Sequence, residues 1–151
     1  MVLMLYRKNR PNINLWNGIG GKIEDGEDLE TSLAREVMEE AGLDINHAKE
    51  LFYAGVVSWA GEHEGSMKKR GMHAYIVELP NDVIVEKVGM DTDEGRLEWK
   101  HVDWVLDKSN VAVVPNIPLF LPEMLKKSGP KEYACVYENN VLKSFSIIDL
   151  E

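Results

Sequence analysis

Arg35-Glu36-Val37-Met38-Glu39-Glu40-Ala41-Gly42 is the most informative stretch of this sequence, and the pattern around it predicts a helix. From Leu29 to Val37 an apolar residue recurs at every fourth position, which is typical of a helix with one buried face. Gly42 stands where a glycine commonly ends a helix. We therefore expect a helix over Asp28–Ala41.

Three glutamates lie on one face of this predicted helix. Glu39 and Glu40 follow Glu36 by three and four residues, so the three side chains fall within an arc of about 100°. Each close pair of like charges destabilises a helix by roughly 0.2–0.5 kcal/mol, and the negative end of the helix dipole adds to this penalty. Three oxygen ligands without His or Cys suit Mg²⁺. The alternative is an ordinary solvated acidic face.

A glycine-rich loop precedes the helix at a fixed spacing. The segment 17–22 reads Asn-Gly-Ile-Gly-Gly-Lys, a composition that allows the backbone to approach a ligand closely. Five residues separate Gly21 from Glu27, and seven more separate Glu27 from Arg35. Together with the carboxylates and Gly42, this pattern resembles the signature of the Nudix hydrolase superfamily.

The resemblance implies an α/β fold, in which a mixed β-sheet is sandwiched between helices (an α/β/α sandwich) with a loop-helix-loop catalytic motif. It implies a single Nudix hydrolase domain over residues 1–151. It also implies hydrolysis of a nucleoside diphosphate linked to another group, with Mg²⁺ or Mn²⁺ as the cofactor. A metal ion would neutralise the charge of the diphosphate and acidify the attacking water.

The resemblance also implies roles for individual residues. The implied metal ligands are Glu36, Glu39, Glu40 and the carbonyl of Gly20, with Glu94 as a further candidate. Glu39, Glu40 and Glu94 compete for the role of general base. The implied structural residues of the motif are Gly21, Glu27, Arg35 and Gly42.

Further residues resemble the MutT-like 8-oxo-dGTP diphosphatase branch. Trp16 and the loop after it look like the Trp-Asn-Gly-x-Gly-Gly-Lys of that branch, which implies that Asn17 reads the purine edge, since an amide both donates and accepts. The alternative for Asn17 is a turn-forming residue before Gly18. The other implied substrate-binding residues are Arg7, Lys22, Trp59 and Asn116.

Each of these assignments has a plainer alternative. Trp59 could be a core aromatic, Arg7 a surface cation and Glu94 a solvated loop acid. Pro115-Asn116 departs from the Pro-Asp of the branch, so discrimination between oxidised and normal guanine could differ.

The resemblance leads to one principal expectation and two alternatives for the function. The first is a diphosphatase that converts an oxidised purine nucleoside triphosphate to the monophosphate and pyrophosphate, in nucleotide-pool sanitation and DNA repair. The second is hydrolysis of ADP-ribose or a dinucleoside polyphosphate. The third is a catalytically silent nucleotide-binding module.

The rest of the chain predicts strands, turns and a second main helix. The expected strands are Val2–Tyr6, Leu51–Trp59, Met72–Leu79, Arg96–Trp99, Tyr133–Tyr137 and Val141–Ile147. We expect a solvated loop over Gly61–Gly71, a hairpin turn at Asn139-Asn140, a helical turn near Val102–Asp107 and a helix over Leu119–Lys127. Members of the family usually have an additional strand before the one matching Val2–Tyr6, so we expect an upstream start or a sheet edge completed by a second subunit.

Composition excludes several classes of partner. The chain has 151 residues with 17 Lys and Arg against 26 Asp and Glu, a net charge of −9, which disfavours nucleic acid polymers and anionic membranes as partners. No apolar run approaches the ~20 residues that span a bilayer. The single cysteine, Cys135, excludes an internal disulfide and is typical of the cytoplasm. The expected partner is a nucleotide substrate, and the expected state is a monomer or homodimer.

Overall fold

The computed structural model describes residues 1–63 and 66–150, apart from the side chains of residues 62–69. The chain divides into two compact units. The first unit consists of Met1–Lys49 and Glu78–Pro118, and the second of Glu50–Val77 and Leu119–Glu151. The expectation of a single domain over residues 1–151 stays a prediction.

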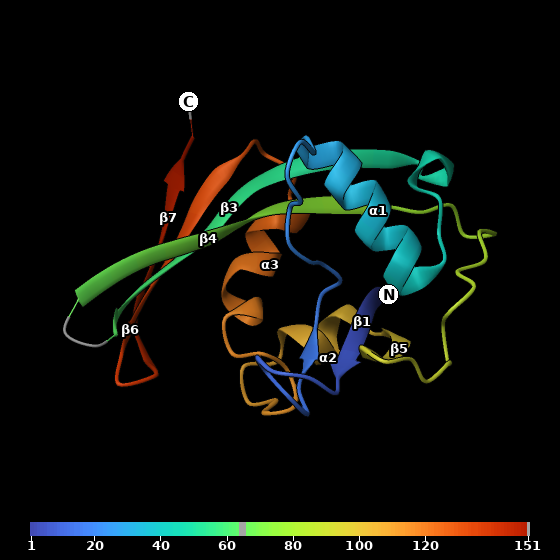
Figure 1. Cartoon of the computed structure of the whole chain (residues 1–151). Coiled ribbons are helices and arrows are strands. Elements are labelled where there is room, and N and C mark those ends of the chain that lie inside the picture. The colour runs from blue at the N-terminus through green and yellow to red at the C-terminus, as the bar shows by residue number, and fades with distance from the viewer. Residues whose placement is uncertain (64–65, 151) are drawn as a thin grey trace. The chain divides into compact units, whose positions relative to one another are not determined.

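The first unit is built on a three-stranded antiparallel sheet. Strand β1 (Val2–Arg7) pairs with β2 (Trp16–Asn17) on one side and with β5 (Gly95–Lys100) on the other, and Figure 1 shows β1 beside β5. The strands predicted over Val2–Tyr6 and Arg96–Trp99 are therefore confirmed. The buried core of this unit consists of Leu5, Val37, Ala41, Leu43, Val85 and Leu97.

Helix α1 (Leu29–Ala41) confirms the predicted helix and its two ends. The carboxylate of Asp28 accepts a hydrogen bond of 2.8 Å from the Thr31 backbone N–H, which caps the first turn. Gly42 ends the helix with φ at 66°, a left-handed conformation that favours glycine, and its N–H donates to the Met38 carbonyl. Val37 and Ala41 of α1 are buried in the core, so the opposite face carries the glutamates.

The remainder of the first unit is largely irregular. It includes the 3₁₀ helix η1 (Ile45–His47) and the short helix α2 (Val102–Leu106). Beyond α2, the chain returns to the sheet: the Trp16 N–H donates to the Ala112 carbonyl at 2.8 Å, and the Val114 N–H donates to the Trp16 carbonyl at 3.0 Å. This pairing places the segment 112–114 alongside β2.

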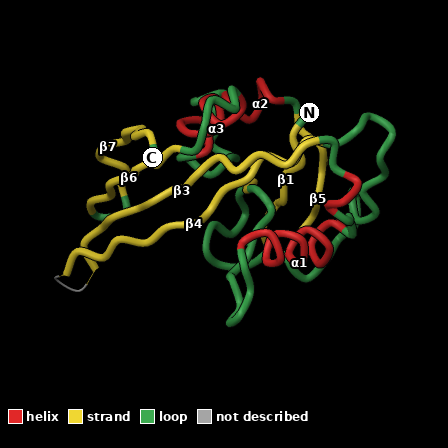
Figure 2. Tube along the Cα trace, turned by 90° about the horizontal axis from the view of Figure 1, so that it is seen from above, coloured by secondary structure: helices red, strands yellow, loops and turns green. Residues whose placement is uncertain are grey.

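The second unit contains a four-stranded sheet in the order β4-β3-β6-β7. Its strands are β3 (Glu50–His63), β4 (Ser66–Glu78), β6 (Lys131–Glu138) and β7 (Val141–Asp149). Strand β6 is parallel to β3 and antiparallel to β7, and Figure 2 shows β3 and β4 running together. Asn139 and Asn140 both have positive φ, 50° and 62°, which confirms the predicted hairpin turn.

Helix α3 (Ile117–Leu125) begins earlier than predicted and ends earlier. Pro118 was expected to precede the helix but lies in its first turn, where a proline is tolerated because the N–H it lacks would have no helical partner. Lys127 was expected inside the helix but has φ at 52°, so the helix has already ended there.

Two expectations about the sheets need correction. The predicted loop over Gly61–Gly71 is wrong for the residues that are described, because 61–63 belong to β3 and 66–71 to β4; residues 64–65 lie outside the description. A charged composition does not exclude a strand, since antiparallel strands can face water. The sequence predicted one mixed sheet, whereas the described strands form two sheets, because β1, β2 and β5 pair among themselves.

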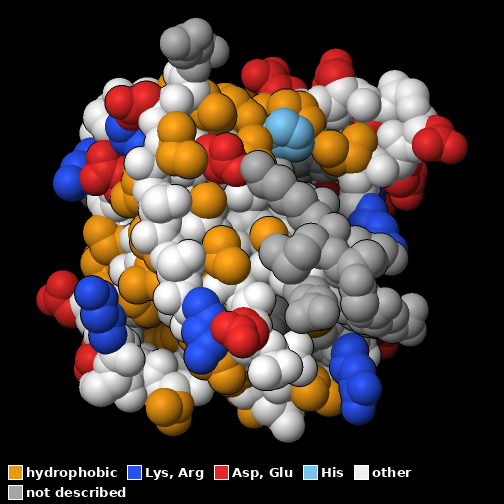
Figure 3. All heavy atoms as spheres, turned by 90° about the vertical axis from the view of Figure 1, so that its left-hand side faces the viewer, with side chains coloured by type: hydrophobic (Ala, Val, Ile, Leu, Met, Phe, Trp, Pro, Cys, Tyr) orange, Lys and Arg blue, Asp and Glu red, His pale blue; other side chains and the backbone are white. Residues whose placement is uncertain are grey.

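Some hydrophobic side chains of the second unit lie at the surface. Val141, Ile147 and Ile148 of β7 are all exposed. Figure 3, which views the left-hand side of Figure 1, shows hydrophobic side chains among scattered acidic and basic ones. Among the described residues, the helices are all too short or too polar to cross a membrane.

Candidate functional site

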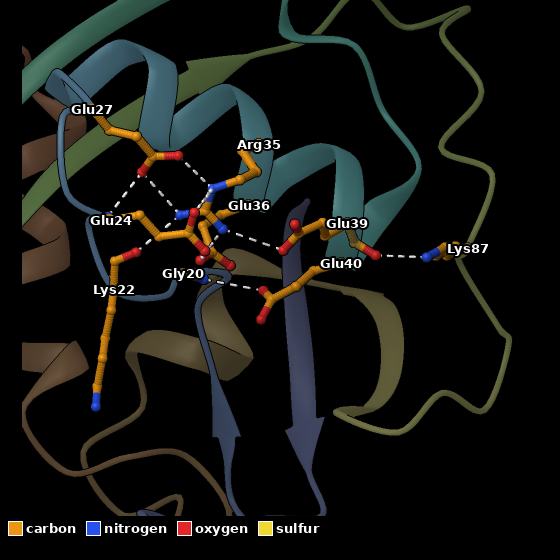
Figure 4. A network of polar contacts seen from close by, with 9 residues as sticks. All are labelled: Gly20, Lys22, Glu24, Glu27, Arg35, Glu36, Glu39, Glu40 and Lys87. Carbon is orange, nitrogen blue, oxygen red and sulfur yellow. Dashed lines mark hydrogen bonds and ion pairs between the residues drawn. The ribbon is translucent and has the colours of Figure 1, made fainter.

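Arg35 connects the glycine-rich loop to helix α1 (Figure 4). Its guanidinium donates to both carboxylate oxygens of Glu27, at 2.6 and 3.0 Å, and to the Lys22 carbonyl at 2.9 Å. Such a bidentate pair is strong and geometrically specific. The hydrogen bond from Arg35 lowers the pKa of Glu27 to about 2, and the backbone N–H of Glu24 adds to this effect. Arg35 thus fixes the loop against the helix.

The same guanidinium reaches the acidic face of α1. One Arg35 nitrogen lies 2.9 Å from Glu36 and 3.3 Å from Glu39. The hydrogen bonds with Glu27 and then with Glu36 raise the pKa of Arg35. The cation expected beside the three glutamates is therefore supplied in part by the chain itself. Sequence reasoning missed this contact, although the spacing of Arg35 and Glu39 is that of an i,i+4 ion pair.

Gly21 lies against the Glu36 carboxylate. A Cβ atom built on Gly21 would lie 2.0 Å from one Glu36 oxygen and 2.4 Å from the other. No side chain fits at that distance, so glycine at position 21 lets the loop backbone approach the acidic face of the helix. The Glu36 side chain is only 14% exposed as a result of this packing and of its contact with Arg35.

Glu40 is held by the loop from the other side. The backbone N–H of Gly20 donates to the Glu40 carboxylate at 3.1 Å. The pKa of Glu40 is raised to about 7, chiefly by burial; the hydrogen bond from Gly20 opposes this shift, and the charges of Glu36 and Glu94 contribute to it. The resemblance implied the Gly20 carbonyl as a metal ligand; what the structure describes at Gly20 is the N–H contact with Glu40.

These glutamates line a cavity of about 280 Å³ together with residues from the irregular segment after residue 79. Its lining residues are Glu36, Glu39, Glu40, Lys87, Thr92, Asp93 and Glu94. The structure thus brings Glu94, which is far away in the sequence, to the acidic face of α1. Sequence reasoning missed Lys87, whose ammonium donates to the Glu39 carbonyl at 2.5 Å. No periodicity or motif singles out this lysine.

The donor set of the cavity fits a hard divalent cation in its chemistry. Four glutamates and Asp93 line it, and their carboxylate oxygens are ligands that Mg²⁺ prefers. Burial is the main cause of the raised pKa of Glu40, and the charges of Glu36 and Glu94 add to it. Among the described residues, no three acidic, His or Cys side chains converge closely enough to hold a metal ion. Glu39, whose side chain is 58% exposed, would have to turn away from Arg35 to join its neighbours as a ligand.

The residues expected to bind the nucleotide do not all line this cavity. The Asn17 amide oxygen accepts from the Gly18 N–H at 2.9 Å, which is the geometry of the turn alternative. Asn116 is half-buried, just beyond the segment that pairs with β2, so Asn17 and Asn116 lie on neighbouring segments. Arg7 donates to the Pro11 carbonyl at 2.8 Å, and its charge lowers the pKa of Glu40 against the effect of burial.

Lys22 and Trp59 are not among the residues that line the cavity. The Lys22 side chain is exposed and points away from the glutamates (Figure 4). Trp59 is half-buried on β3 in the second unit. Their substrate-binding roles stay predictions.

A family model and two characterised relatives match this chain. The model of the NUDIX domain matches residues 1–120. The chain is 29% identical over 150 residues to the oxidized purine nucleoside triphosphate hydrolase of Mus musculus, which covers 99% of this chain and 88% of the mouse protein. It is 28% identical over 102 residues to the protein of the same name from Danio rerio, which covers 68% of this chain and 59% of the fish protein.

A solved structure is also similar to this chain. The MutT protein from Bacillus halodurans matches 96% of this chain and 88% of its own, with a TM-score of 0.68 and 23% sequence identity. At that identity the match concerns the fold. It confirms the α/β fold class expected from the sequence.

Proposed function

This chain belongs to the NUDIX family, and we propose that it is a Mg²⁺-dependent hydrolase that converts an oxidised purine nucleoside triphosphate to the monophosphate and pyrophosphate. The observation that carries the proposal is the cavity that Glu36, Glu39, Glu40 and Glu94 line together. The names of the mouse and zebrafish relatives support the choice of substrate class.

The cavity would act on a diphosphate through its carboxylates. A divalent cation bound by Glu36, Glu39 and Glu40 would neutralise phosphate charge and lower the pKa of the attacking water. Gly21 and Arg35 hold Glu36 in place, and the Gly20 N–H holds Glu40. An acidic protein could take an acidic substrate in this way, because the cation lies between the two sets of negative charge.

Glu40 and Glu94 are the strongest candidates for the general base. A base works best when its pKa lies near the working pH, and burial raises the pKa of Glu40 to about 7 in the absence of a bound cation. Glu94 is exposed and lines the same cavity from a segment distant in the sequence. If the glutamates of α1 bind the metal ion and Glu94 does not, the Glu94 carboxylate is available to accept the proton of the attacking water.

We assign base recognition to the neighbouring segments that carry Asn17 and Asn116. An amide can donate to and accept from a purine edge at the same time. Reading the base requires the Asn17 side chain to leave the Gly18 N–H that it now accepts from. Trp59 stays the predicted stacking surface for a base, and Arg7 and Lys22 stay predicted substrate-binding residues.

Product release from a panel of substrates tests this function. Pyrophosphate and phosphate are measured with Mg²⁺ from normal and oxidised nucleoside triphosphates, ADP-ribose and dinucleoside polyphosphates. Glu40→Gln is the blank, and Glu30→Gln, at an exposed position in the first turn of α1, is the matched control that should keep full activity.

The outcomes separate the candidate functions. Pyrophosphate from an oxidised purine well above its normal parent supports the proposal. Activity confined to ADP-ribose or a dinucleotide overturns the substrate while keeping the metal site. Inactivity of the wild type on every compound would instead favour a nucleotide-binding module.

The cellular setting follows from the same proposal. An enzyme that removes oxidised nucleotides would serve nucleotide-pool sanitation and, through it, DNA repair. We place it in the cytoplasm, because a single cysteine is typical of reducing compartments. Size-exclusion chromatography with light scattering would decide between monomer and homodimer.

A further inference from the structure

Two adjacent residues after β1 hydrogen-bond to three successive backbone carbonyls of the cavity wall. The Lys8 ammonium donates to the Thr92 carbonyl at 2.9 Å, and the Asn9 amide donates to the Asp93 carbonyl at 2.9 Å. The backbone N–H of Lys8 donates to the Glu94 carbonyl at 3.1 Å. Every carbonyl from residue 92 to residue 94 is therefore bound by the segment Lys8-Asn9.

The turn that receives these bonds is closed at its base. The Thr92 N–H donates to the Gly95 carbonyl at 2.9 Å, and the Thr92 hydroxyl donates to the same carbonyl at 2.8 Å. A Cβ on Gly95 would lie 1.8 Å from the Tyr6 carbonyl, and Gly95 has φ at 145°, so only glycine lets the turn join β5 this close to β1. Thr92, Asp93 and Glu94 project from this base into the cavity lining.

Electrostatics alone would move this turn away from helix α1. Asp93 and Glu94 carry the same charge as Glu36 and Glu40 on the facing wall, and like charges that share a site repel. Asp93 and Glu94 are exposed, so little apolar burial anchors the turn. Lys8 and Asn9 donate hydrogen bonds that oppose this repulsion, and the bond from the Lys8 ammonium is of the stronger, charge-assisted kind.

We propose that Lys8 and Asn9 are positioning residues, which hold the 92–94 turn so that Glu94 faces the acidic side of α1 across the cavity. This proposal rests on the proposed function, because that function gives Glu94 a part in the reaction. Neither residue needs to touch the substrate, because both act through the backbone of the turn.

The first test asks whether the two residues act through Glu94. Lys8→Met and Asn9→Asp remove the donors with little change of shape, Lys8→Arg keeps a donor, and Lys108→Met is a control at an exposed lysine elsewhere in the first unit. Each variant is measured in the wild-type and the Glu94→Gln background. We expect kcat to fall about tenfold for Lys8→Met and Asn9→Asp in the wild-type background, with KM changing less than about twofold.

A double-mutant cycle gives the deciding comparison. In the Glu94→Gln background, Lys8→Met and Asn9→Asp should cause no further loss, because their effect passes through a side chain that has already been replaced. Lys8→Arg should recover most of the wild-type kcat. A loss of the same size in both backgrounds, or a change in KM alone, would overturn the proposal.

The second test needs no substrate. Hydrogen exchange of the Thr92 and Lys8 amides reports on the turn and on its bond to Glu94. Both amides should exchange faster in Asn9→Asp and Lys8→Met than in Lys108→Met, and unchanged rates would refute the holding role. If the wild type hydrolyses no nucleotide, the proposed function fails, while hydrogen exchange still decides whether Lys8 and Asn9 hold the turn.

Discussion

Gly21 and Glu36 are in direct contact across the junction between the glycine-rich loop and helix α1. A side-chain carbon on Gly21 would lie 2.0 Å from a carboxylate oxygen of Glu36. The loop therefore folds back onto helix α1 at these two positions, beside the acidic face of the helix.

Replacing Gly21 should displace Glu36 and abolish most of the activity. In Gly21→Ala the new methyl group forces the Glu36 carboxylate or the loop to move by more than an ångström, and a displacement of that size lowers kcat about 100-fold. Gly18→Ala is the matched control, since nothing lies within 4 Å of a Cβ at that position. Steady-state kinetics of the two variants checks this, and equal kcat values would contradict the role given to the contact.

Replacing Arg35 by lysine should destabilise the protein although the charge is kept. Lysine cannot donate to both oxygens of Glu27 while also reaching Glu36, and Glu27 is only 13% exposed. We expect the free energy of unfolding to fall. Lys126→Met breaks an ion pair with Glu123 in which the lysine is 66% exposed, so this control should lower the free energy of unfolding much less. Urea unfolding measures both variants.

The protein should lose stability in acid partly through Glu27. The pKa of Glu27 is about 2 in the folded protein, against an ordinary value of 4.5 for a glutamate. A carboxyl group with a depressed folded pKa stabilises the protein above its unfolded pKa, and this stabilisation disappears as the pH falls from 4.5 towards 2. Urea midpoints across that range should decline less steeply in Glu27→Gln than in the wild type. Parallel declines would assign the acid sensitivity to other carboxylates.

Glu40→Gln should stabilise the metal-free protein while removing its activity. The folded pKa of Glu40 is raised to about 7, so its ionised form costs stability at every pH above its unfolded value. At about pH 8 we expect a gain of about 1 kcal/mol, or ~2–4 °C in Tm. The gain should shrink as the pH falls from about 7 to 4.5, below which Glu40 is protonated in both states. Thermal unfolding in EDTA measures this difference, and a lower Tm at about pH 8 would contradict the unfavourable burial of Glu40.

Local patterns were sufficient to predict helix α1 and several strands. Helix α1 follows from its apolar spacing and from Gly42, because both act within a few residues of the helix. The hairpin at Asn139-Asn140 follows from residues that tolerate positive φ. Strand β2 could not be predicted, since its two residues are held by β1 and by the segment 112–114, which are contacts between parts distant in the sequence.

The same division applies to the candidate site. The sequence by itself determined that Glu36, Glu39 and Glu40 share one face, because helical geometry depends only on their spacing. Only the tertiary structure decided that Glu94 and Lys87 line the cavity with them and that Lys8 and Asn9 bind the turn of Glu94. The bonds from Lys8 and Asn9 join residues 84 positions apart and are exposed, and side-chain bonds of this kind leave no periodic trace in a sequence.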